Sequence, residues 1–318
     1  MLLVTGGAGY IGGVVAERLI QQGHDVCVFD NLSRGYRDVV PRKAVFVEGD
    51  LADRNLLGKV FAEYPIEGVL HFAAFALVGE SMSNAALYFR NNVESALVLL
   101  DATQTAGVNR FVFSSTCAVF GDKNPSPISE ELPKNPINPY GESKLVVEKA
   151  LHWYHQSHGM NYVALRYFNA CGASQERGER HEPETHLIPL VLDAAAGERP
   201  SVQIFGTDYP TPDGTCIRDY IHVEDLAEAH IQALGAAPQL SGCYNVGTGR
   251  GHSVREVIDT VRRVTGREVP DILADRRPGD PPELVADASK IQKLLGWKAE
   301  RDLEAAVSSA WKFKMRAK

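Results

Sequence analysis

Tyr140 and Lys144 are the residues whose types and spacing most directly suggest chemistry, and they lie in the run Asn138-Pro-Tyr-Gly-Glu-Ser-Lys144. Residues four apart share one face of a helix, so Lys144 can lie beside Tyr140. A phenol has a pKa of about 10 in water, and a nearby ammonium lowers that pKa by favouring the phenolate. A tyrosine tuned in this way can take a proton from a substrate hydroxyl and return it later. The same spacing occurs by chance in ordinary helices, and the glycine-rich N-terminus of this chain is what favours the catalytic interpretation.

The pair needs a helix to hold it, and the surrounding sequence predicts one. Pro139 fits the first turn of a helix, and Asn138 is a suitable N-cap residue. The helix is expected to run to about His158. Further helices are expected at Ile11–Gln22 and Asn84–Ala106.

Short apolar runs alternate with these helices, which is typical of a parallel, doubly wound α/β sheet. The expected strands are residues 2–4, 25–29, 44–47, 68–72, 110–113 and 162–166. After Phe168 the chain becomes irregular and richer in charge, Pro and Gly. We therefore expect a Rossmann-type domain over residues 1–168, with about 219–247 packing back onto it. A smaller mixed α/β domain is expected over residues 169–318, with a ligand-binding cleft between the two domains.

Three glycines near the N-terminus predict a dinucleotide site. Gly6, Gly9 and Gly12 form G-x-x-G-x-x-G between an expected strand and an expected helix. Glycines allow a tight turn and a close approach of the backbone to a pyrophosphate, which rests at the helix N-terminus. Asp30 ends the next expected strand, where a ribose-binding carboxylate belongs in such a site.

The acidic residues favour NAD over NADP. Asp30 can accept hydrogen bonds from both ribose hydroxyls of adenosine and would repel a 2′-phosphate. Arg34 and Arg37 follow closely and keep the 2′-phosphate alternative open. Asp50, at the end of another expected strand, is a candidate for the adenine edge, with loop capping as the alternative role.

Composition narrows the class of protein and its partners. The 318 residues suffice for one large or two modest domains, and the net charge of −7 disfavours nucleic acid as the main partner. The cysteines are scattered, odd in number and never in C-x-x-C, which indicates reduced thiols in the cytoplasm rather than a disulfide framework or a zinc site. We expect no metal, no signal peptide and no membrane span. The five cysteines are Cys27, Cys117, Cys171, Cys216 and Cys243.

Motifs along nearly the whole chain resemble those of a known family. The first group is Thr5-Gly-Gly-Ala-Gly-Tyr-Ile-Gly12, Asp30-Asn-Leu-Ser33, Gly49-Asp-Leu51, His71-Phe-Ala-Ala74, Val78-Gly-Glu-Ser81, Asn91-Asn-Val93, Phe113-Ser-Ser-Thr116 and Tyr140–Lys144. The second group is Leu165-Arg-Tyr-Phe-Asn169, Ile204-Phe-Gly206, Asp213-Gly-Thr215, Arg218-Asp-Tyr-Ile-His-Val223, Tyr244-Asn-Val-Gly247 and Arg276-Arg-Pro-Gly-Asp280. The first group resembles the extended short-chain dehydrogenase/reductase superfamily. The second, more specific group resembles the UDP-hexose 4-epimerases within it.

The resemblance implies reversible epimerisation at C4 of UDP-galactose and UDP-glucose, by transient hydride transfer to bound NAD through a 4-keto intermediate. It implies that Tyr140 and Thr116 act on the sugar, with Lys144 beside them. The residues implied to surround NAD are Gly6, Gly9, Tyr10, Ile11, Gly12, Asp30, Asn31, Ser33, Asp50, Leu51, Phe72, Ala73, Ala74, Asn91, Ser114, Tyr140, Lys144 and Phe168. Those implied to hold the UDP-hexose substrate are Thr116, Tyr140, Asn169, Leu187, Phe205, Arg218, Tyr220, Arg277, Asp280 and Leu284. The charged members also suit these roles from chemistry alone, because Arg binds diphosphate and Asp accepts from a ribose.

The resemblance also implies a homodimer. In the family, the helices matching Asn84–Ala106 and Pro139–His158 pair across a two-fold axis as a helix bundle. Six apolar residues of these segments are available for this interface, although some of them must face the sheet. They are Leu97, Leu99, Leu100, Val146, Val147 and Leu151.

Three positions depart from the family pattern. Ala76 stands where many members have a Lys near the cofactor phosphate, which removes one contact to NAD. His186 stands where Asn is common, and we assign it no site role. Leu284 stands where members restricted to UDP-glucose and UDP-galactose have a Tyr, and the smaller side chain implies room for a 2-acetamido group.

The residues around Thr116, Tyr140 and Lys144 disfavour two other functions. A nucleotide-sugar 4,6-dehydratase would carry an acidic pair directly after Thr116, where this chain has Cys117 and Ala118. A non-catalytic NAD-binding regulator would be expected to lack Tyr140 or Lys144. UDP-N-acetylhexosamine and UDP-uronic acid 4-epimerases remain open alternatives.

Overall fold

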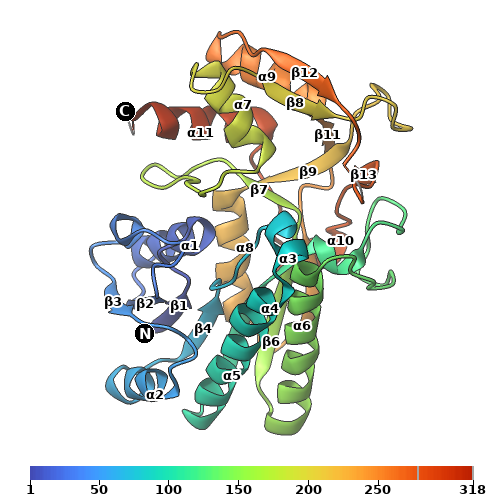
Figure 1. The fold of residues 1–318 in the computed structure, drawn as a ribbon. Coiled ribbons are helices and arrows are strands. Elements are labelled where there is room, and N and C mark those ends of the chain that lie inside the picture. The colour runs from blue at the N-terminus through green and yellow to red at the C-terminus, as the bar shows by residue number, and fades with distance from the viewer. Residues whose placement is uncertain (278, 317–318) are drawn as a thin grey trace.

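A parallel sheet of seven strands lies at the centre of the lower part of the computed structural model, which describes residues 1–277 and 279–316 (Figure 1). Every neighbouring pair in it is parallel. The strand order is β10-β6-β5-β4-β1-β2-β3. The strands are β1 (Leu2–Thr5), β2 (Val26–Asp30), β3 (Val45–Glu48), β4 (Gly68–His71), β5 (Arg110–Thr116), β6 (Asn161–Tyr167) and β10 (Gly242–Val246). The predicted doubly wound α/β class is confirmed.

Helices cover both faces of this sheet, because successive residues of a buried strand point to opposite faces. Val4 packs into a core with α1 (Tyr10–Gln21) and α8 (Val223–Ala236). Leu3 packs into the other core, with α2 (Arg54–Glu63), α5 (Ser95–Thr105) and α6 (Pro139–His158). The order of the strands reverses between β1 and β4, and in such sheets ligands bind outside the carboxyl ends of the strands at this point.

Helix α6 begins and ends where the sequence predicts. The Asn138 side chain accepts a hydrogen bond of 2.8 Å from the backbone N–H of Gly141, and Pro139 occupies the first helical turn. Gly159 ends the helix in the left-handed conformation, with φ of 70°. Tyr140 is thereby fixed in the first turn, next to the end of β5.

The single helix predicted at Asn84–Ala106 is wrong in detail. The segment comprises α4 (Ala85–Tyr88), a π-helical stretch at Phe89–Glu94 and α5, and it follows a short helix α3 (Val78–Ser83). Hydrophobic periodicity does not distinguish one extra residue per turn from an ordinary helix. Such π-helical stretches are rare and often lie at functional sites.

The second half of the chain adds smaller sheets above the large one. Strand β9 (Ile217–His222) pairs with β7 (Asn169–Cys171), β11 (Gly251–Ser253) and β13 (Glu283–Leu284). In a separate sheet, β12 (Asp271–Ala274) pairs with β8 (Val202–Phe205). Helices α7 (Leu187–Ala195), α9 (Val254–Thr265) and α11 (Leu303–Arg316) share a separate core with these strands, while α10 (Ser289–Leu295) packs near α8 and β10. Among the described residues, none of the helices combines the length and the apolar character needed to cross a membrane.

Candidate active site

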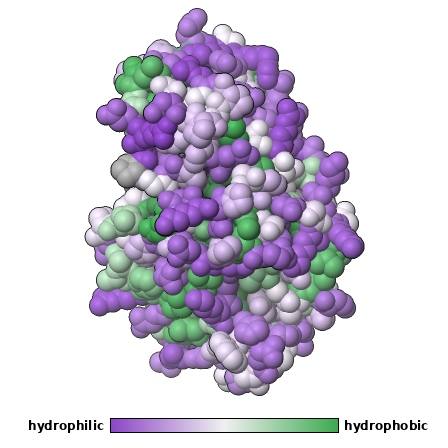
Figure 2. All heavy atoms as spheres, turned by 90° about the vertical axis from the view of Figure 1, so that its right-hand side faces the viewer, coloured by the Kyte–Doolittle hydropathy of each residue, from purple (hydrophilic) through white to green (hydrophobic). Residues whose placement is uncertain are grey.

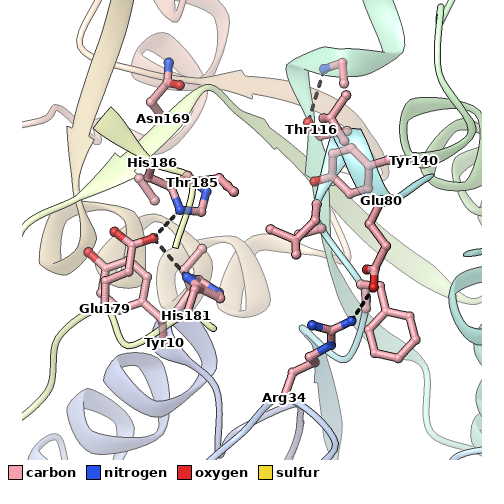
Figure 3. Close-up of a pocket in the computed structure, with 18 of the residues that line it drawn as sticks. Tyr10, Arg34, Glu80, Thr116, Tyr140, Asn169, Glu179, His181, Thr185 and His186 are labelled. Atoms are coloured by element: carbon pink, nitrogen blue, oxygen red, sulfur yellow. Dashed lines mark hydrogen bonds and ion pairs between the residues drawn. The ribbon is translucent and has the colours of Figure 1, made fainter. Parts of the chain in front are cut away.

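A cavity of about 1550 Å³ lies between the carboxyl ends of the large sheet and the C-terminal elements. Every residue predicted to act in catalysis, cofactor binding or substrate binding lines it. Residues from both halves of the chain face one another across this cavity in Figure 3, with Thr116 and Tyr140 on one side and Asn169 and His186 on the other. The structure therefore brings together residues that are up to about 280 positions apart in the sequence.

The glycine turn leaves space that fits a pyrophosphate. Gly6 has φ of 73°, and a Cβ atom on it would lie 2.5 Å from the backbone nitrogen of Ala73. A Cβ on Gly12 would lie 2.3 Å from the carbonyl oxygen of Gly6. Gly9 is the N-cap of α1, where no side chain caps the helix and no acidic residue lies in the first turn. The N-terminus of α1 is thus free to bind the anionic part of a dinucleotide.

Asp30 is held at the end of β2 by backbone donors. Its Oδ2 accepts a hydrogen bond of 3.0 Å from the N–H of Ala8, and its Oδ1 accepts one of 2.9 Å from the N–H of Leu32. Burial raises the pKa of Asp30, and these two hydrogen bonds oppose the shift. The carboxylate retains lone pairs for the hydroxyls of a ribose.

Arg34 and Arg37, the two arginines that leave NADP possible as the cofactor, each contact another side chain. The Nη2 of Arg34 lies 2.6 Å from Oε1 of Glu80, as Figure 3 shows. The guanidinium of Arg37 stacks over the ring of Phe46, 4.2 Å from its centroid. The contact with Glu80 partly neutralises Arg34, which favours NAD over a cofactor with a 2′-phosphate.

Asp50 caps its own loop, which is one of the two roles that the sequence leaves open for it. Its Oδ1 accepts a hydrogen bond of 2.9 Å from the N–H of Ala52, so it caps its own loop. Its Oδ2 accepts one of 2.9 Å from Nδ2 of Asn31, and both residues line the cavity.

Tyr140, Thr116 and Lys144 lie together at the junction of β5 and α6. Thr116 ends β5, and its Oγ1 accepts a hydrogen bond of 3.1 Å from the N–H of Ala118. A hydrogen bond also joins the side chains of Thr116 and Tyr140. The Nζ of Lys144 donates a hydrogen bond of 2.8 Å to the carbonyl oxygen of Ser114. This cluster places a phenol, a hydroxyl and an amine along the wall of the cavity.

The lowering of the Tyr140 pKa by Lys144, expected from the sequence, is not seen in the protein alone. Burial raises the pKa of Tyr140 well above its ordinary value, and nearby Tyr167 adds to the shift. Burial also lowers the pKa of Lys144 to about 7, which the carboxylate of Glu148 opposes. Desolvation disfavours both charged forms, and it depends on the tertiary packing around the pair rather than on their spacing.

Glu148 and Arg166 form a buried ion pair that the sequence did not reveal. The Nη2 of Arg166 lies 2.6 Å from Oε2 of Glu148, and its Nε donates to Oε1 at 2.8 Å. Ser115 donates to the same Oε1 at 2.6 Å. Glu148 follows Lys144 by one helical turn, a spacing that signals a shared face, but its partners lie on β5 and β6. The pair links the helix that carries Tyr140 to the sheet.

Asn92 is a second residue that the sequence did not single out for its contacts. It lies in the π-helical stretch and accepts a hydrogen bond of 2.8 Å from the N–H of Phe75. Its Nδ2 lies within 3.0 Å of the carbonyl oxygen of Phe75 and of Oγ of Ser143. Asn92 therefore joins the loop after β4, which lines the cavity, to helix α6.

Two arginines from the second half of the chain line the cavity. The Nη1 of Arg218 donates to the carbonyl oxygens of Ile217 and Pro281, at 2.8 and 2.9 Å, and its Nη2 lies 3.5 Å from Asp280. The guanidinium of Arg277 stacks over the ring of Phe205, 3.9 Å from its centroid. Cations held in this way suit an anionic diphosphate, for which guanidinium groups offer several donors.

Leu284 lines the same cavity. It pairs with Arg218 between β13 and β9, and it packs against the apolar cluster that contains Cys117 and Phe168. Asn169 lies nearby on β7 and donates a hydrogen bond of 2.9 Å to the carbonyl oxygen of Asp219.

Comparisons with known proteins agree with this site. A family described as "NAD dependent epimerase/dehydratase family" matches residues 2–247. The chain is 50% identical to UDP-glucose 4-epimerase of Streptomyces lividans, over 98% of this chain and 95% of that protein. It matches the structure of UDP-glucose 4-epimerase from Brucella ovis in complex with NAD at a TM-score of 0.94 and 47% identity, covering 98% of this chain and 97% of the other. UDP-glucose-4-epimerase from Stenotrophomonas maltophila, with bound NAD and formylated UDP-arabinopyranose, gives a TM-score of 0.95 at 41% identity, covering 99% and 98%.

Proposed function

This chain belongs to the NAD dependent epimerase/dehydratase family, and from that premise we propose that it interconverts UDP-galactose and UDP-glucose by inverting C4. Its cofactor is NAD. The observation that carries the substrate assignment is the arrangement of the cavity, which Tyr140, Arg218 and Arg277 all line. Tyr140 offers a proton acceptor for a sugar hydroxyl, and the two arginines offer cations for a diphosphate.

The protein's own groups bind, orient and exchange a proton with the sugar. The turn at Gly6, Gly9 and Gly12 and the carboxylate of Asp30 would hold NAD, which supplies the reversible hydride acceptor that turns C4 into a keto carbon and back. Tyr140 takes the proton of the C4 hydroxyl and later returns it, while Thr116 holds the sugar O4. The keto sugar turns about its link to the diphosphate and presents its other face, so that C4 is inverted.

Lys144 has a positioning and electrostatic role in this scheme. Its Nζ points to the backbone of β5 beside the cavity, and its charged form is supported by Glu148. A cation there would oppose the rise in the Tyr140 pKa that burial causes, and it would offer a donor to the nicotinamide ribose. Ala76 lines the cavity without a polar side chain, which agrees with one cofactor contact fewer.

The proposed function is tested by incubating the purified protein with UDP-galactose and measuring UDP-glucose by chromatography. We expect conversion toward an equilibrium mixture with no net consumption of cofactor, because each turnover restores NAD. An NAD-binding regulator would give no product, and a uronate-specific epimerase would act only on UDP-uronic acids; either result would contradict the proposal.

We propose a homodimer formed through α5 and α6. Four of the apolar candidates, Leu99, Leu100, Val147 and Leu151, are instead buried in the core beneath the helices. The two remaining candidates, Leu97 and Val146, are partly exposed, and Phe89 and Trp153 of the same helical segments are exposed. Figure 2 shows apolar patches on the lower half of one face, the half in which Figure 1 places both helices.

Light scattering should give twice the chain mass of 34.8 kDa at micromolar concentration. Trp153 is 67% exposed, and Trp153→Arg is expected to yield a monomer because it inserts a charge into an apolar interface. Leu273→Arg is the matched control, since Leu273 is 63% exposed on β12, far from α6 in the fold. A monomeric wild-type protein would refute the dimer.

We propose that the sugar pocket also admits 2-acetamido sugars, because Leu284 is smaller than tyrosine. Leu284→Tyr should suppress turnover of UDP-N-acetylgalactosamine while leaving UDP-galactose turnover nearly unchanged. The measurement is kcat/KM for both substrates in both proteins. Rapid turnover of UDP-galactose without any N-acetylated product in the wild type would show that other residues close the pocket.

The division into domains and the location of the protein also stand as proposals. Residues 1–168 would form the NAD-binding domain and 169–318 the UDP-sugar-binding domain, and the pairing of β10 with β6 supports the return of about 219–247 to the first. A cytoplasmic location is supported by the five cysteines, all of which are free thiols.

A further inference from the structure

Four potential metal ligands converge in the loop between β7 and α7. Glu179, His181, Glu184 and His186 each present one ligand atom to a common point, and these atoms all lie within 4.8 Å of one another. The Nδ1 atoms of His181 and His186 lie 3.0 and 2.8 Å from the same Oε1 of Glu179. The Nδ1 of His186 also lies 2.8 Å from Oε1 of Glu184. Figure 3 shows both imidazoles directed at the Glu179 carboxylate.

The separations are close to those that a bound ion requires. Bonds of about 2.0–2.1 Å to zinc place tetrahedral ligands roughly 3.3 Å apart. The contacts of 3.0 and 2.8 Å to Oε1 of Glu179 need to open by only a few tenths of an ångström around such an ion, whereas the most widely separated ligand atoms, up to 4.8 Å apart, need to move closer together.

The charge of the cluster suits a divalent cation. In the form that binds a metal, the two carboxylates contribute a charge of −2 and the two imidazoles contribute none. The neighbouring arginines do not neutralise it, because Arg177 pairs with Glu17 at 2.7 Å and Arg180 with Asp38 at 2.7 Å. The Glu179 side chain is only 8% exposed, so its negative charge is stable there only with a positive charge close by.

In the protein alone, hydrogen bonds hold these groups together. The Nδ1 atoms of His181 and His186 both contact Oε1 of Glu179, and Nδ1 of His186 also contacts Oε1 of Glu184. A metal ion at the same point would take the place of these hydrogen bonds and bind the same ligand atoms.

We propose that Glu179, His181, Glu184 and His186 form a structural binding site for a divalent transition-metal ion of the Zn²⁺ type. Imidazole nitrogens and carboxylate oxygens are ligands that zinc accepts in tetrahedral sites. All four ligands come from the protein, which leaves no open position for a water or a substrate and therefore indicates a structural role. The scattered cysteines gave no sign of this site, because none of the ligands is a cysteine.

The site would fix one wall of the cofactor and substrate cavity. The loop that carries the ligands lies over the start of α1, where the Tyr10 hydroxyl donates a hydrogen bond of 2.6 Å to the carbonyl oxygen of Gly172. The ring of His181 meets that of Tyr10 edge to face, with centroids 6.4 Å apart. His186 directly precedes α7, which begins with Leu187, a residue proposed to contact UDP. An ion would thus join the cofactor side of the cavity to its substrate side.

The test is the metal content of the intact protein, purified without an affinity tag that binds metals. The protein is given one equivalent of Zn²⁺, passed through a desalting column and analysed by mass spectrometry for metals. We expect about one zinc per chain in the wild type and a loss of roughly tenfold or more in His181→Ala/His186→Ala. With Co²⁺ in place of zinc, the wild type should show the strong visible absorption of a tetrahedral site, and the variant should not.

Two controls separate this outcome from misfolding and from adventitious binding. His152→Ala removes an exposed histidine of α6 and should retain the full metal content. His186→Asn alone introduces a residue common in the family at this position, which should fold and still lose the metal. A wild type that keeps no zinc, or a double variant that keeps as much as the wild type, would show that the cluster is a protonated ion-pair network only. Because the readout is bound metal, it stands apart from the proposed epimerase activity.

Discussion

Tyr140→Phe is expected to lower kcat by about two to four orders of magnitude, because it removes the group that exchanges the C4 proton. The substitution deletes one oxygen atom, and the ring remains to fill the same space between Thr116 and Tyr88. The fold and the bound NAD should therefore persist. Turnover of UDP-galactose, circular dichroism and the cofactor released on denaturation measure these three quantities.

Tyr154→Phe is the matched control. Tyr154 lies on the same helix, and its hydroxyl bonds to Asp101 on α5, away from the cavity. Its loss should leave kcat unchanged. A Tyr140→Phe protein with nearly normal kcat would show that another group serves as the base, and loss of NAD from that variant would point to a binding role instead.

Glu148→Gln is expected to reduce the free energy of unfolding by about 3–5 kcal/mol, because it leaves the Arg166 guanidinium buried without its counter-charge. The side chains of Glu148 and Arg166 are 4% and 5% exposed, so water cannot replace the lost carboxylate. The amide has nearly the shape of the carboxylate, so the effect reports charge rather than packing. Urea unfolding followed by tryptophan fluorescence provides the measurement.

Two further variants serve as controls for this experiment. Lys149→Gln changes the exposed neighbour on α6 and should alter stability by no more than about 0.5 kcal/mol. The double variant Glu148→Leu/Arg166→Met replaces the ion pair by apolar groups and should recover most of the loss. If Glu148→Gln proved as stable as the wild type, the buried guanidinium of Arg166 would not need the charge of Glu148.

The sequence by itself determined the parts of this protein that depend on neighbouring residues. Asn138 and Pro139 fix the start of α6 through an N-cap and a restricted φ angle, and both act within one turn. Any Cβ atom at Gly6 or Gly12 would meet the backbone, so glycine at both positions indicates the tight turn. Alternation of strands and helices predicted the sheet, and the motifs identified the residues that line the cavity.

The tertiary structure alone decided the features that depend on partners distant along the chain. Whether Leu99 and Leu100 face the core or a second chain is set by packing against the sheet, which periodicity cannot resolve. The raised pKa of Tyr140 comes from burial, and burial is a property of everything that surrounds the side chain. Glu148 finds Arg166 on another element, 18 positions away, because α6 packs against β6. His181 and His186 lie only five residues apart, yet their meeting at Glu179 depends on the path of a loop with no regular period, so no pattern in the sequence predicts it.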